Sequence, residues 1–162
     1  MQPIIRPVEQ NDLAELQHFV VLAFEPIFAS FQAILGPAIY NVLYPKDWQT
    51  LQRDLVASLC SNEKMLVWVA EVDSKLVGFI AYHLNHESKI GEVELLFVHP
   101  DYHNDGIGTL LNNFALTKLQ EAGMLVAEVG TGGDDSHAPA RRSYEKAGYT
   151  ALPLVRYFKQ LG

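Results

Sequence analysis

Cysteine is almost missing from this sequence: Cys60 stands alone, so no disulfide can form within the chain. A sequence of this kind suits a reducing compartment, and we expect a cytoplasmic protein in which Cys60 is a small, buried apolar residue. The first residues, MQPIIRPVEQ, lack a basic start followed by a long apolar core. We therefore expect no signal peptide.

Basic residues are also scarce, with 12 Lys and Arg against 19 Asp and Glu, which gives a formal net charge of −7. Nucleic-acid binding relies on a basic surface, so we expect no nucleic-acid partner and a mild preference for a cationic one. No uninterrupted apolar run approaches the roughly 20 residues of a membrane-spanning helix. We therefore expect no membrane partner.

Two well-known phosphate loops are absent. The pattern G-x-x-x-x-G-K-[ST] does not occur, and the dinucleotide pattern G-x-G-x-x-G fails because Leu111 stands at its third glycine position. These absences disfavour a nucleoside triphosphate or nicotinamide site.

The 162 residues, of which 49% are hydrophobic and 19% charged, fit one globular domain over residues 1–162. Apolar periodicity and turn residues predict a mixed α/β order of elements. Helices are expected after Asn11 or Asp12 (with Glu15 completing a capping box), over 47–60, from Gly106 to Gly123 and from 137 or 138 to 148. Strands are expected at 3–8, 65–72 and 76–83, around Glu92 and Glu94, and at 125–130 and 150–161.

Residues 25–48 are rich in aromatics and are broken by Pro26, Gly36-Pro37 and Pro45. We expect an irregular segment here. Two interpretations remain open, namely core or interface packing and the wall of a ligand pocket.

The central feature is the stretch from Glu92 to Leu111, in which an apolar strand turns abruptly and opens through Gly106 and Gly108 into a helix. The first amides of a helix have no partner within the helix, and the helix dipole favours negative charge there. The stretch therefore predicts an anion cradle. A tight strand-to-helix turn without a ligand is the alternative.

Residues 98–111, VHPDYHNDGIGTLL, resemble the acetyl-CoA-binding motif of the GCN5-related N-acetyltransferases, whose pattern is [RQ]-x-x-G-x-[GA]. The loop comprises His103, Asn104, Asp105, Gly106, Ile107, Gly108 and Thr109. His103 departs from the pattern, since Arg or Gln is usual there.

A second segment, 137–149, is similar to that family's pattern N-x-x-A-x-x-x-Y-[DE]-K-x-G-[FY]. Ala140, Tyr144, Glu145, Lys146, Gly148 and Tyr149 match it, while His137 replaces the asparagine. The resemblance implies a mixed, mostly antiparallel sheet of about six to seven strands, splayed between strands 4 and 5, with about four helices.

The resemblance also implies how acetyl-CoA is held. The loop 103–109 would bind its pyrophosphate, and the backbone of Leu96, Phe97 and Val98 would bind the pantetheine arm and the oxyanion. His137, Ala140 and Tyr144 would complete the cofactor site.

Two residues are candidates for the chemistry. Glu94 lies in an otherwise apolar strand, where partial burial would raise its pKa, so it is the expected base. Glu92 shares its face of the strand and is the reserve. Tyr144 is the expected acid for the leaving thiolate. The alternatives are solvent-facing strand charges for the glutamates and simple packing on the sheet for Tyr144.

The resulting hypothesis is an acetyl-CoA-dependent N-acetyltransferase that transfers acetyl directly to a primary amine, of a small molecule or a peptide, in a ternary complex. Acetyl-CoA is the co-substrate and no metal is expected. The alternative is a non-catalytic acyl-CoA sensor. A homodimer formed through the aromatic segment is compatible with both.

Several polar side chains have other expected roles. His99 and His103 have a metal-like spacing, but Pro100 prevents a helix that would align them, so no zinc site is expected. His83 and His86 are expected to face solvent. Arg141-Arg142 are expected either to reach a CoA phosphate or to cover the helix surface. Asp134-Asp135 are expected to form a solvated loop tip, with attraction of a cationic acceptor as the alternative.

Overall fold

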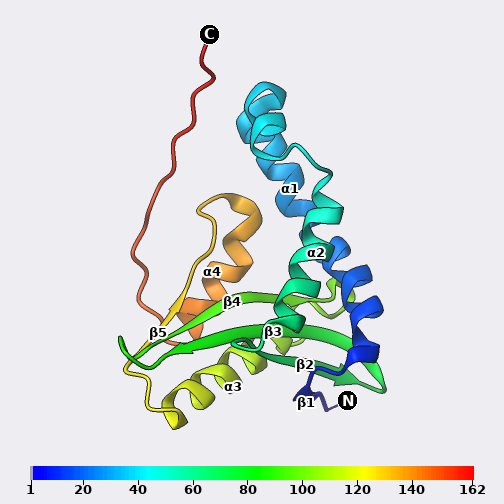
Figure 1. Cartoon of the computed structure of the whole chain (residues 1–162), viewed down its shortest axis with the longest axis vertical. Coiled ribbons are helices and arrows are strands. Elements are labelled where there is room, and N and C mark those ends of the chain that lie inside the picture. The colour runs from blue at the N-terminus through cyan, green and yellow to red at the C-terminus, as the bar shows by residue number, and fades with distance from the viewer. Residues whose placement is uncertain (1) are drawn as a thin grey trace.

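A computed structural model describes residues 2–162 and shows one five-stranded sheet with helices on both faces (Figure 1). The strands are β1 (Ile4–Pro7), β2 (Leu66–Val72), β3 (Lys75–Asn85), β4 (Ile90–Val98) and β5 (Val126–Val129). The helices are α1 (Leu13–Leu43), α2 (Trp48–Ser61), α3 (Ile107–Glu121) and α4 (Ala138–Lys146). The α/β class and the four helices are as predicted. The expected six to seven strands are wrong, since the sheet has five.

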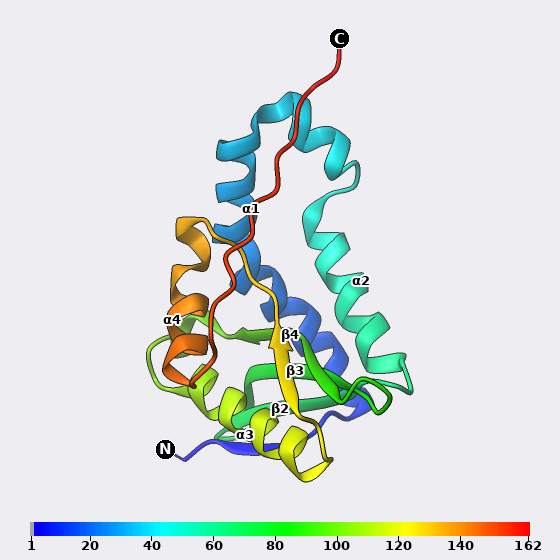
Figure 2. The same ribbon diagram turned by 90° about the vertical axis from the view of Figure 1, so that its left-hand side faces the viewer.

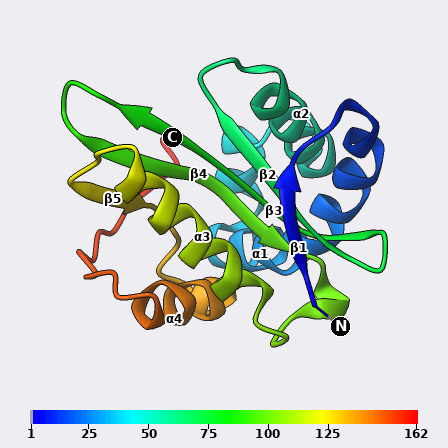
Figure 3. The ribbon, with the colours of Figure 1, turned by 90° about the horizontal axis from the view of Figure 1, so that it is seen from below.

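The strands lie in sequence order, and only the pair β4 and β5 is parallel. Viewed from below, α3 lies on one face of the sheet and α1 and α2 on the other (Figure 3). One buried cluster, around Leu16, Phe19 and Phe79, joins α1 and α2 to the sheet. A second, around Ile80, Leu111 and Ala115, joins α3 to the opposite face. Two cores thus hold the central strands from both sides.

The splay expected between strands 4 and 5 follows from their pairing. β5 pairs with β4 only over four positions, from Ile90↔Val126 to Val93↔Val129. β4 continues to Val98, so its second half has β3 on one side and no β5 partner on the other. A cleft can therefore open beside Glu94 and the residues that follow it.

Glu94 itself occupies a β-bulge. The register with β3 passes from Ala81↔Leu95 to Tyr82↔Val93, so Glu94 is the extra residue of β4. A bulge re-aims a side chain and increases the local twist of the strand. This irregularity lies next to Val93, the last residue of β4 that pairs with β5, so Glu94 stands where β4 and β5 begin to separate.

The predicted strand at residues 150–161 is wrong. In the structure, residues 150–162 are exposed and without secondary structure, and they extend beyond the outer end of α1 (Figure 2). The alternation of Leu152 and Leu154 is typical of a strand, but both are 81% exposed and neither meets a neighbouring strand. A strand requires a paired edge, which sequence periodicity cannot supply.

The expected irregular segment at 25–48 is largely helical, because α1 runs on to Leu43. A kink at Gly36, with φ of +73°, divides the helix, and Pro37 begins the second part, where a missing N–H costs least. The aromatics of this segment pack on α2, with Phe28 stacked on Trp48 at 4.9 Å and Tyr44 against Phe28 at 5.4 Å. Packing between α1 and α2 therefore accounts for Phe28, Tyr44 and Trp48, whereas Phe31 also stacks on His137 at 5.7 Å.

One stretch among the described residues, Gln10–Leu43, is long and apolar enough to cross a membrane, with a mean hydropathy of 1.8. The core helices of globular proteins pass the same test. Leu16, Phe19 and Val20 are buried against the sheet, whereas 17% of the most apolar part of the stretch is buried as a whole. A single helix of this kind is weak evidence for a membrane span.

Close contact between α3 and the sheet depends on Gly91. A Cβ at this position would lie 2.2 Å from Leu119 Cδ2 and 3.0 Å from its Cγ. Gly91→Ala is expected to lower the free energy of unfolding by about 1–3 kcal/mol, the usual cost of overpacking a core. Urea denaturation measures this, with Gly133→Ala as control because a Cβ there meets nothing within 4 Å. Equal stability of both variants would contradict the packing described.

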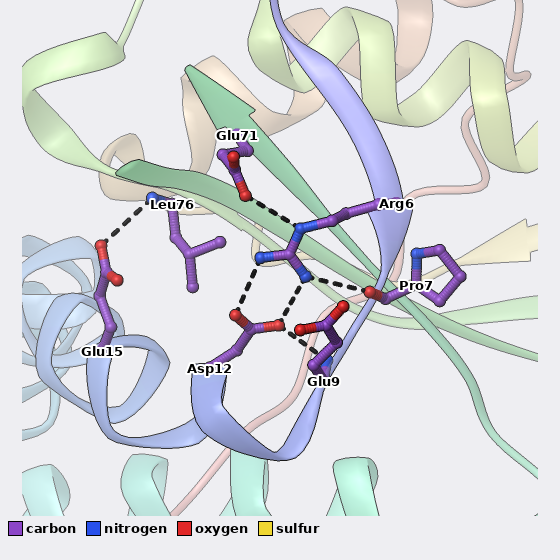
Figure 4. Close-up of polar contacts among 7 residues, drawn as sticks. All are labelled: Arg6, Pro7, Glu9, Asp12, Glu15, Glu71 and Leu76. Carbon is purple, nitrogen blue, oxygen red and sulfur yellow. Dashed lines mark hydrogen bonds and ion pairs between the residues drawn. The ribbon is translucent and has the colours of Figure 1, made fainter. Parts of the chain in front are cut away.

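Arg6 ties the first strand to the start of α1 (Figure 4). Its guanidinium donates to both carboxylate oxygens of Asp12, at 2.8 and 2.9 Å, and its Nε donates to Glu71 at 2.9 Å. The predicted capping box from Asp12 to Glu15 is wrong, because Glu15 instead accepts from the backbone N–H of Leu76 on β3. Asp12 accepts from the N–H of Glu9 and so stabilises the preceding turn.

Asp12→Asn is expected to destabilise the fold by about 2 kcal/mol at pH 7, since hydrogen bonds to a charged group contribute roughly 1.5–3 kcal/mol. The hydrogen bonds from Arg6 outweigh burial and lower the pKa of Asp12. A lowered carboxyl pKa stabilises the folded state above the ordinary value of about 3.9, and that contribution is lost as pH falls through the lowered value.

Urea denaturation at pH 7 and pH 3 tests this prediction, with Asp54→Asn on the exposed side of α2 as control. The gap between wild type and Asp12→Asn should shrink at the lower pH. A gap that stays constant would contradict the ion pair.

Candidate functional site

A cleft of about 140 Å³ opens where β4 and β5 separate. Residues from α1, β4, the end of β5, the segment that follows it and α4 form its wall. They are Phe24, Ile27, Val93, Glu94, Leu95, Leu96, Val129, Gly130, Thr131, His137, Ala140 and Tyr144. Glu94 and Tyr144, which are 50 positions apart in the sequence, thus share one cavity with His137, Ala140 and Leu96.

Tyr144 enters the cleft from α4. Burial, with a further contribution from Tyr149, raises the pKa of Tyr144 to about 12. Its phenol therefore keeps its proton throughout the neutral range. The Tyr149 ring meets it edge-on at 5.7 Å and restricts its position. The resulting group is a protonated O–H donor inside the cleft.

Glu94 presents a carboxylate from the β4 bulge, with 39% of its side chain exposed. Glu92 is 40% exposed, and it is not among the described residues that line the cleft. Burial, together with repulsion from Glu94 and Glu128, raises the pKa of Glu92. Of the two glutamates, only Glu94 lines the cleft.

His83 does not simply face solvent as expected. Its Nδ1 lies 3.2 Å from a Glu94 oxygen and its Nε2 lies 3.7 Å from a Glu92 oxygen. Among the described residues, these three form the one group whose ligand-type atoms all lie within 4.8 Å of one another, as a shared cation would require. The two carboxylates approach opposite nitrogens of the ring, which is the geometry of an imidazole bridging two acids.

The anion cradle lies at the start of α3. Gly106 has φ of +81° and is its N-cap, and no side chain caps the helix. Asn104 also has a positive φ, +69°, which only glycine, asparagine and aspartate adopt readily. The Ile107 side chain is buried in the core and anchors the turn. The first amides, at Ile107, Gly108 and Thr109, have no intrahelical acceptor and can serve an anion.

His103, whose position in the motif implies a contact with pyrophosphate, contacts the end of β4 in this structure. Its Nε2 lies 3.0 Å from the carbonyl oxygen of Val98, the last residue of β4. In this conformation the ring holds the loop, including Asp105, to the strand.

The three predicted residues at the end of β4 lie in different surroundings. Leu96 lines the cleft. Phe97 is 4% exposed and packs on Phe19 and Phe79 in the core, so only its backbone can reach a ligand. Val98 lies beside the cradle, with its Cγ2 3.8 Å from where a Gly108 Cβ would stand.

Asp134 lies in the segment for which the sequence predicted a solvated loop tip, but three side chains engage its carboxylate. Asp134 accepts hydrogen bonds from Ser30 of α1 at 2.6 Å and from Ser136, and its Oδ1 lies 2.6 Å from His137 Nδ1. Burial opposes its ionisation, but these three hydrogen bonds outweigh burial and hold its pKa well below the ordinary value. His137 is thereby fixed at the cleft, against the ring of Phe31.

Arg141 supports the same loop. Its guanidinium donates to the backbone oxygens of Gly132 and Asp134, at 2.6 and 2.7 Å. Plain surface cover does not describe Arg141, and the contact with a CoA phosphate stays a prediction. No local signal separates it from a surface arginine.

His99 and His103 are engaged separately. His99 Nδ1 accepts from the N–H of Asp101 at 3.2 Å, whereas His103 contacts Val98. Both rings therefore stabilise the turn between β4 and α3.

Comparison with known proteins shows which family the sequence matches. The acetyltransferase (GNAT) family pattern covers residues 37–149, which is more than half of the chain. A relative from Archaeoglobus fulgidus, an uncharacterized N-acetyltransferase, is 38% identical over 91 residues, covering 53% of this chain and 60% of the relative. The chain thus spans less than two thirds of that relative's length.

Two solved structures share the fold. The PaiA N-acetyltransferase from Thermoplasma acidophilum in complex with coenzyme A has a TM-score of 0.67 and 22% identity, over 94% of this chain and 92% of that one. The ribosomal-protein-S18-alanine N-acetyltransferase from Escherichia coli has a TM-score of 0.69 and 18% identity, over 94% and 80%. With the family pattern, the cleft and the cradle together, the chain belongs to the acetyltransferase (GNAT) family.

Proposed function

We propose that this protein is an acetyl-CoA-dependent N-acetyltransferase that transfers acetyl directly to a primary amine. The observation that carries the proposal is that Glu94 and Tyr144 line the same cleft. Glu94 supplies a carboxylate from β4, and Tyr144 supplies a protonated phenol from α4. Direct acyl transfer needs one group to accept a proton from the amine and another to donate one to the thiolate.

The cradle and the cleft suit the two ends of the co-substrate. The amides of Ile107, Gly108 and Thr109 can bind the pyrophosphate of CoA, because an open helix N-terminus favours anions. The edge of β4 that lacks a β5 partner can pair with the amide groups of the pantetheine arm. The acetyl thioester would then reach the cleft beside Glu94 and Tyr144.

The proton steps follow from these positions. A primary ammonium, with a pKa near ~10.4 when lysine-like, gives a proton to the Glu94 carboxylate. The neutral nitrogen attacks the thioester carbonyl, and backbone N–H groups at the end of β4 stabilise the oxyanion. As the C–S bond breaks, the sulfur takes the Tyr144 proton, and the attacking nitrogen loses its second proton, which restores the Tyr144 phenol. The products are the acetylated amine, the CoA thiol and the proton held by Glu94.

Cys60 has no part in this scheme. It lies on α2 and packs beside the core cluster of α1 and the sheet. Burial, with a smaller effect of Asp12, raises the pKa of the Cys60 thiol, which disfavours the thiolate that a covalent acyl-enzyme would need.

Negative charge near the cleft supports a cationic amine as the acceptor. Glu92, Glu94 and Glu128 lie together at the divergence of β4 and β5, and the whole chain carries a net charge of −7. Such a field attracts a cationic amine of a small molecule or a peptide. With its single reduced cysteine, the protein is proposed to act in the cytoplasm, which cell fractionation would test.

Thiol release from acetyl-CoA with a panel of amines tests the proposal, with the acetylated product identified by mass spectrometry. We expect one CoA thiol per acetylated amine. Binding of acetyl-CoA that raises the melting temperature without any transfer would instead indicate the non-catalytic sensor. Neither binding nor transfer would reject both.

We further propose that the protein forms a homodimer and that residues 150–162, rather than the aromatic segment 25–48, form its interface. Leu152, Leu154, Val155, Tyr157 and Leu161 are 73–91% exposed in this tail, and one edge of β5 has no partner strand among the described residues. Light scattering should give twice the monomer mass for the chain and the monomer mass after deletion of 150–162. A monomeric mass for the undeleted chain would reject this proposal.

A further inference from the structure

His137 is held at the cleft by contacts on one edge and one face of its ring. Its Nδ1 lies 2.6 Å from Asp134 Oδ1, and Gly132 packs so closely against Nδ1 and Cε1 that a Cβ there would collide with both atoms. The ring stacks on Phe31, with the centroids 5.7 Å apart. The side chains of His137 and Asp134 are only 13% and 12% exposed. These contacts restrict the imidazole to one orientation.

The partner of Nδ1 decides which ring nitrogen is free. Burial opposes the ionisation of Asp134, but hydrogen bonds from Ser136, Ser30 and His137 outweigh burial and hold the pKa of its carboxyl well below the ordinary value. The ionised carboxylate can only accept, so Nδ1 carries a hydrogen and donates it to Asp134. In the neutral imidazole, Nε2 then carries the lone pair.

Nε2 has no partner within the protein. Among residues 2–162, the hydrogen bonds of the His137 ring all use Nδ1. In the same residues, the buried polar side-chain atoms that lack a partner are Asn112 Oδ1 and Tyr149 Oη, so Nε2 is not buried. Since His137 lines the cleft, its side chain presents an accessible hydrogen-bond acceptor to a bound substrate.

The place of His137 along α4 indicates which substrate it meets. His137 directly precedes α4 and lies against Phe31 of α1. Near the other end of α4, Ser143 Oγ lies 3.7 Å from where a Cβ of Gly108 in the anion cradle would stand. Tyr144 follows His137 by about two helical turns, or roughly 10 Å along the helix. His137 therefore stands at the α1 end of the cleft, and Tyr144 at the end nearer the cradle.

We propose that His137 recognises the acceptor, with its Nε2 accepting a hydrogen bond from a second N–H or O–H group of the amine substrate. The acetylated nitrogen lies between Glu94 and Tyr144, and the second group reaches toward α1. The inference rests on the proposed function and names its substrate class, an amine with a second hydrogen-bond donor, such as a diamine or an amino alcohol. It assigns His137 to the amine, whereas the family resemblance implies a contact with acetyl-CoA.

Asp134 is a positioning residue in this arrangement. A carboxylate that accepts from one imidazole nitrogen fixes the tautomer and makes the other nitrogen a stronger acceptor. Ser30 donates to the same carboxylate at 2.6 Å and so ties the pair to α1. The bond from Ser30 thus keeps the recognition group at the α1 end of the cleft.

The test compares kcat/KM for putrescine, aminobutanol and butylamine, measured by thiol release from acetyl-CoA. The wild type should prefer the first two amines, which carry a second donor. In His137→Asn, the side-chain amide can still donate to Asp134, but nothing stands at the position of Nε2. We expect this preference to fall about tenfold, the usual effect of one lost hydrogen bond, with kcat/KM for butylamine unchanged. The KM for acetyl-CoA and the thermal shift that acetyl-CoA produces should also stay unchanged.

His86→Asn, in the exposed turn after β3, is the matched control and should keep the wild-type preference. Equal kcat/KM of the wild type for all three amines would overturn the proposal, whether or not the variant folds. A preference that persists in His137→Asn would overturn it as well, since the negative charge near the cleft would then account for the preference. A higher KM for acetyl-CoA in His137→Asn would return the residue to the cofactor site.

The wild type reports separately on the proposed function. Turnover of butylamine by the wild type supports the transfer reaction even where the variant rejects the role of His137. Absence of wild-type turnover with every amine would reject both proposals.

Discussion

Glu94→Gln is expected to lower kcat by roughly 10²–10⁴-fold, the usual contribution of a positioned general base. Glutamine keeps the size of the side chain and its place in the β4 bulge, but it cannot accept the ammonium proton. The affinity for acetyl-CoA should stay unchanged, because the cradle at α3 is separate from this carboxylate.

Steady-state kinetics with a saturating amine measures this effect, and a thermal shift with acetyl-CoA checks binding. Glu87→Gln, in the exposed turn between β3 and β4, is the control and should behave as wild type. A kcat within twofold of wild type for Glu94→Gln would remove Glu94 as the base of the proposed reaction.

Tyr144→Phe should produce the second large effect, a loss of kcat of roughly 10²–10³-fold, because the thiolate would leave without a proton donor. The ring remains, so its edge contact with Tyr149 and the fold should survive. Since the pKa of Tyr144 is about 12, the wild-type phenol stays protonated, and its ionisation should not reduce the rate below about pH 11.

A pH–rate profile and kcat for both proteins check this prediction. Tyr157→Phe, on a side chain that is 91% exposed, is the matched control. Retention of the wild-type kcat in Tyr144→Phe would remove Tyr144 as the acid while leaving the cleft as the site of transfer.

Local signals explain what the sequence could predict. Asp47 was expected to begin a helix, and its carboxylate does accept from the N–H of Thr50 at 2.9 Å. Gly123 and Gly148 were expected to follow helix ends, and both have a positive φ. The cleft residues Glu94 and Tyr144 could be named because each lies in a short pattern that the family resemblance interprets.

Long-range contacts explain what the sequence could not predict. The bridge from His83 to Glu94 depends on a bulge in strand pairing, and the bond from Ser30 to Asp134 joins residues 104 positions apart. In α1, Pro26 and Gly36 both indicate a break; the chain does kink at Gly36, whereas the helix continues through Pro26, close to where Phe28 packs on Trp48. Tertiary contacts therefore overrode local propensity at these places.

A crystal structure of the protein with CoA is the most direct test of the proposed site. We expect the pyrophosphate on the amides of Ile107, Gly108 and Thr109, the pantetheine arm along the unpaired edge of β4, and the thiol within hydrogen-bond distance of the Tyr144 hydroxyl. CoA bound elsewhere, or a thiol remote from both Glu94 and Tyr144, would contradict the assignment of this cleft as the site of acetyl transfer.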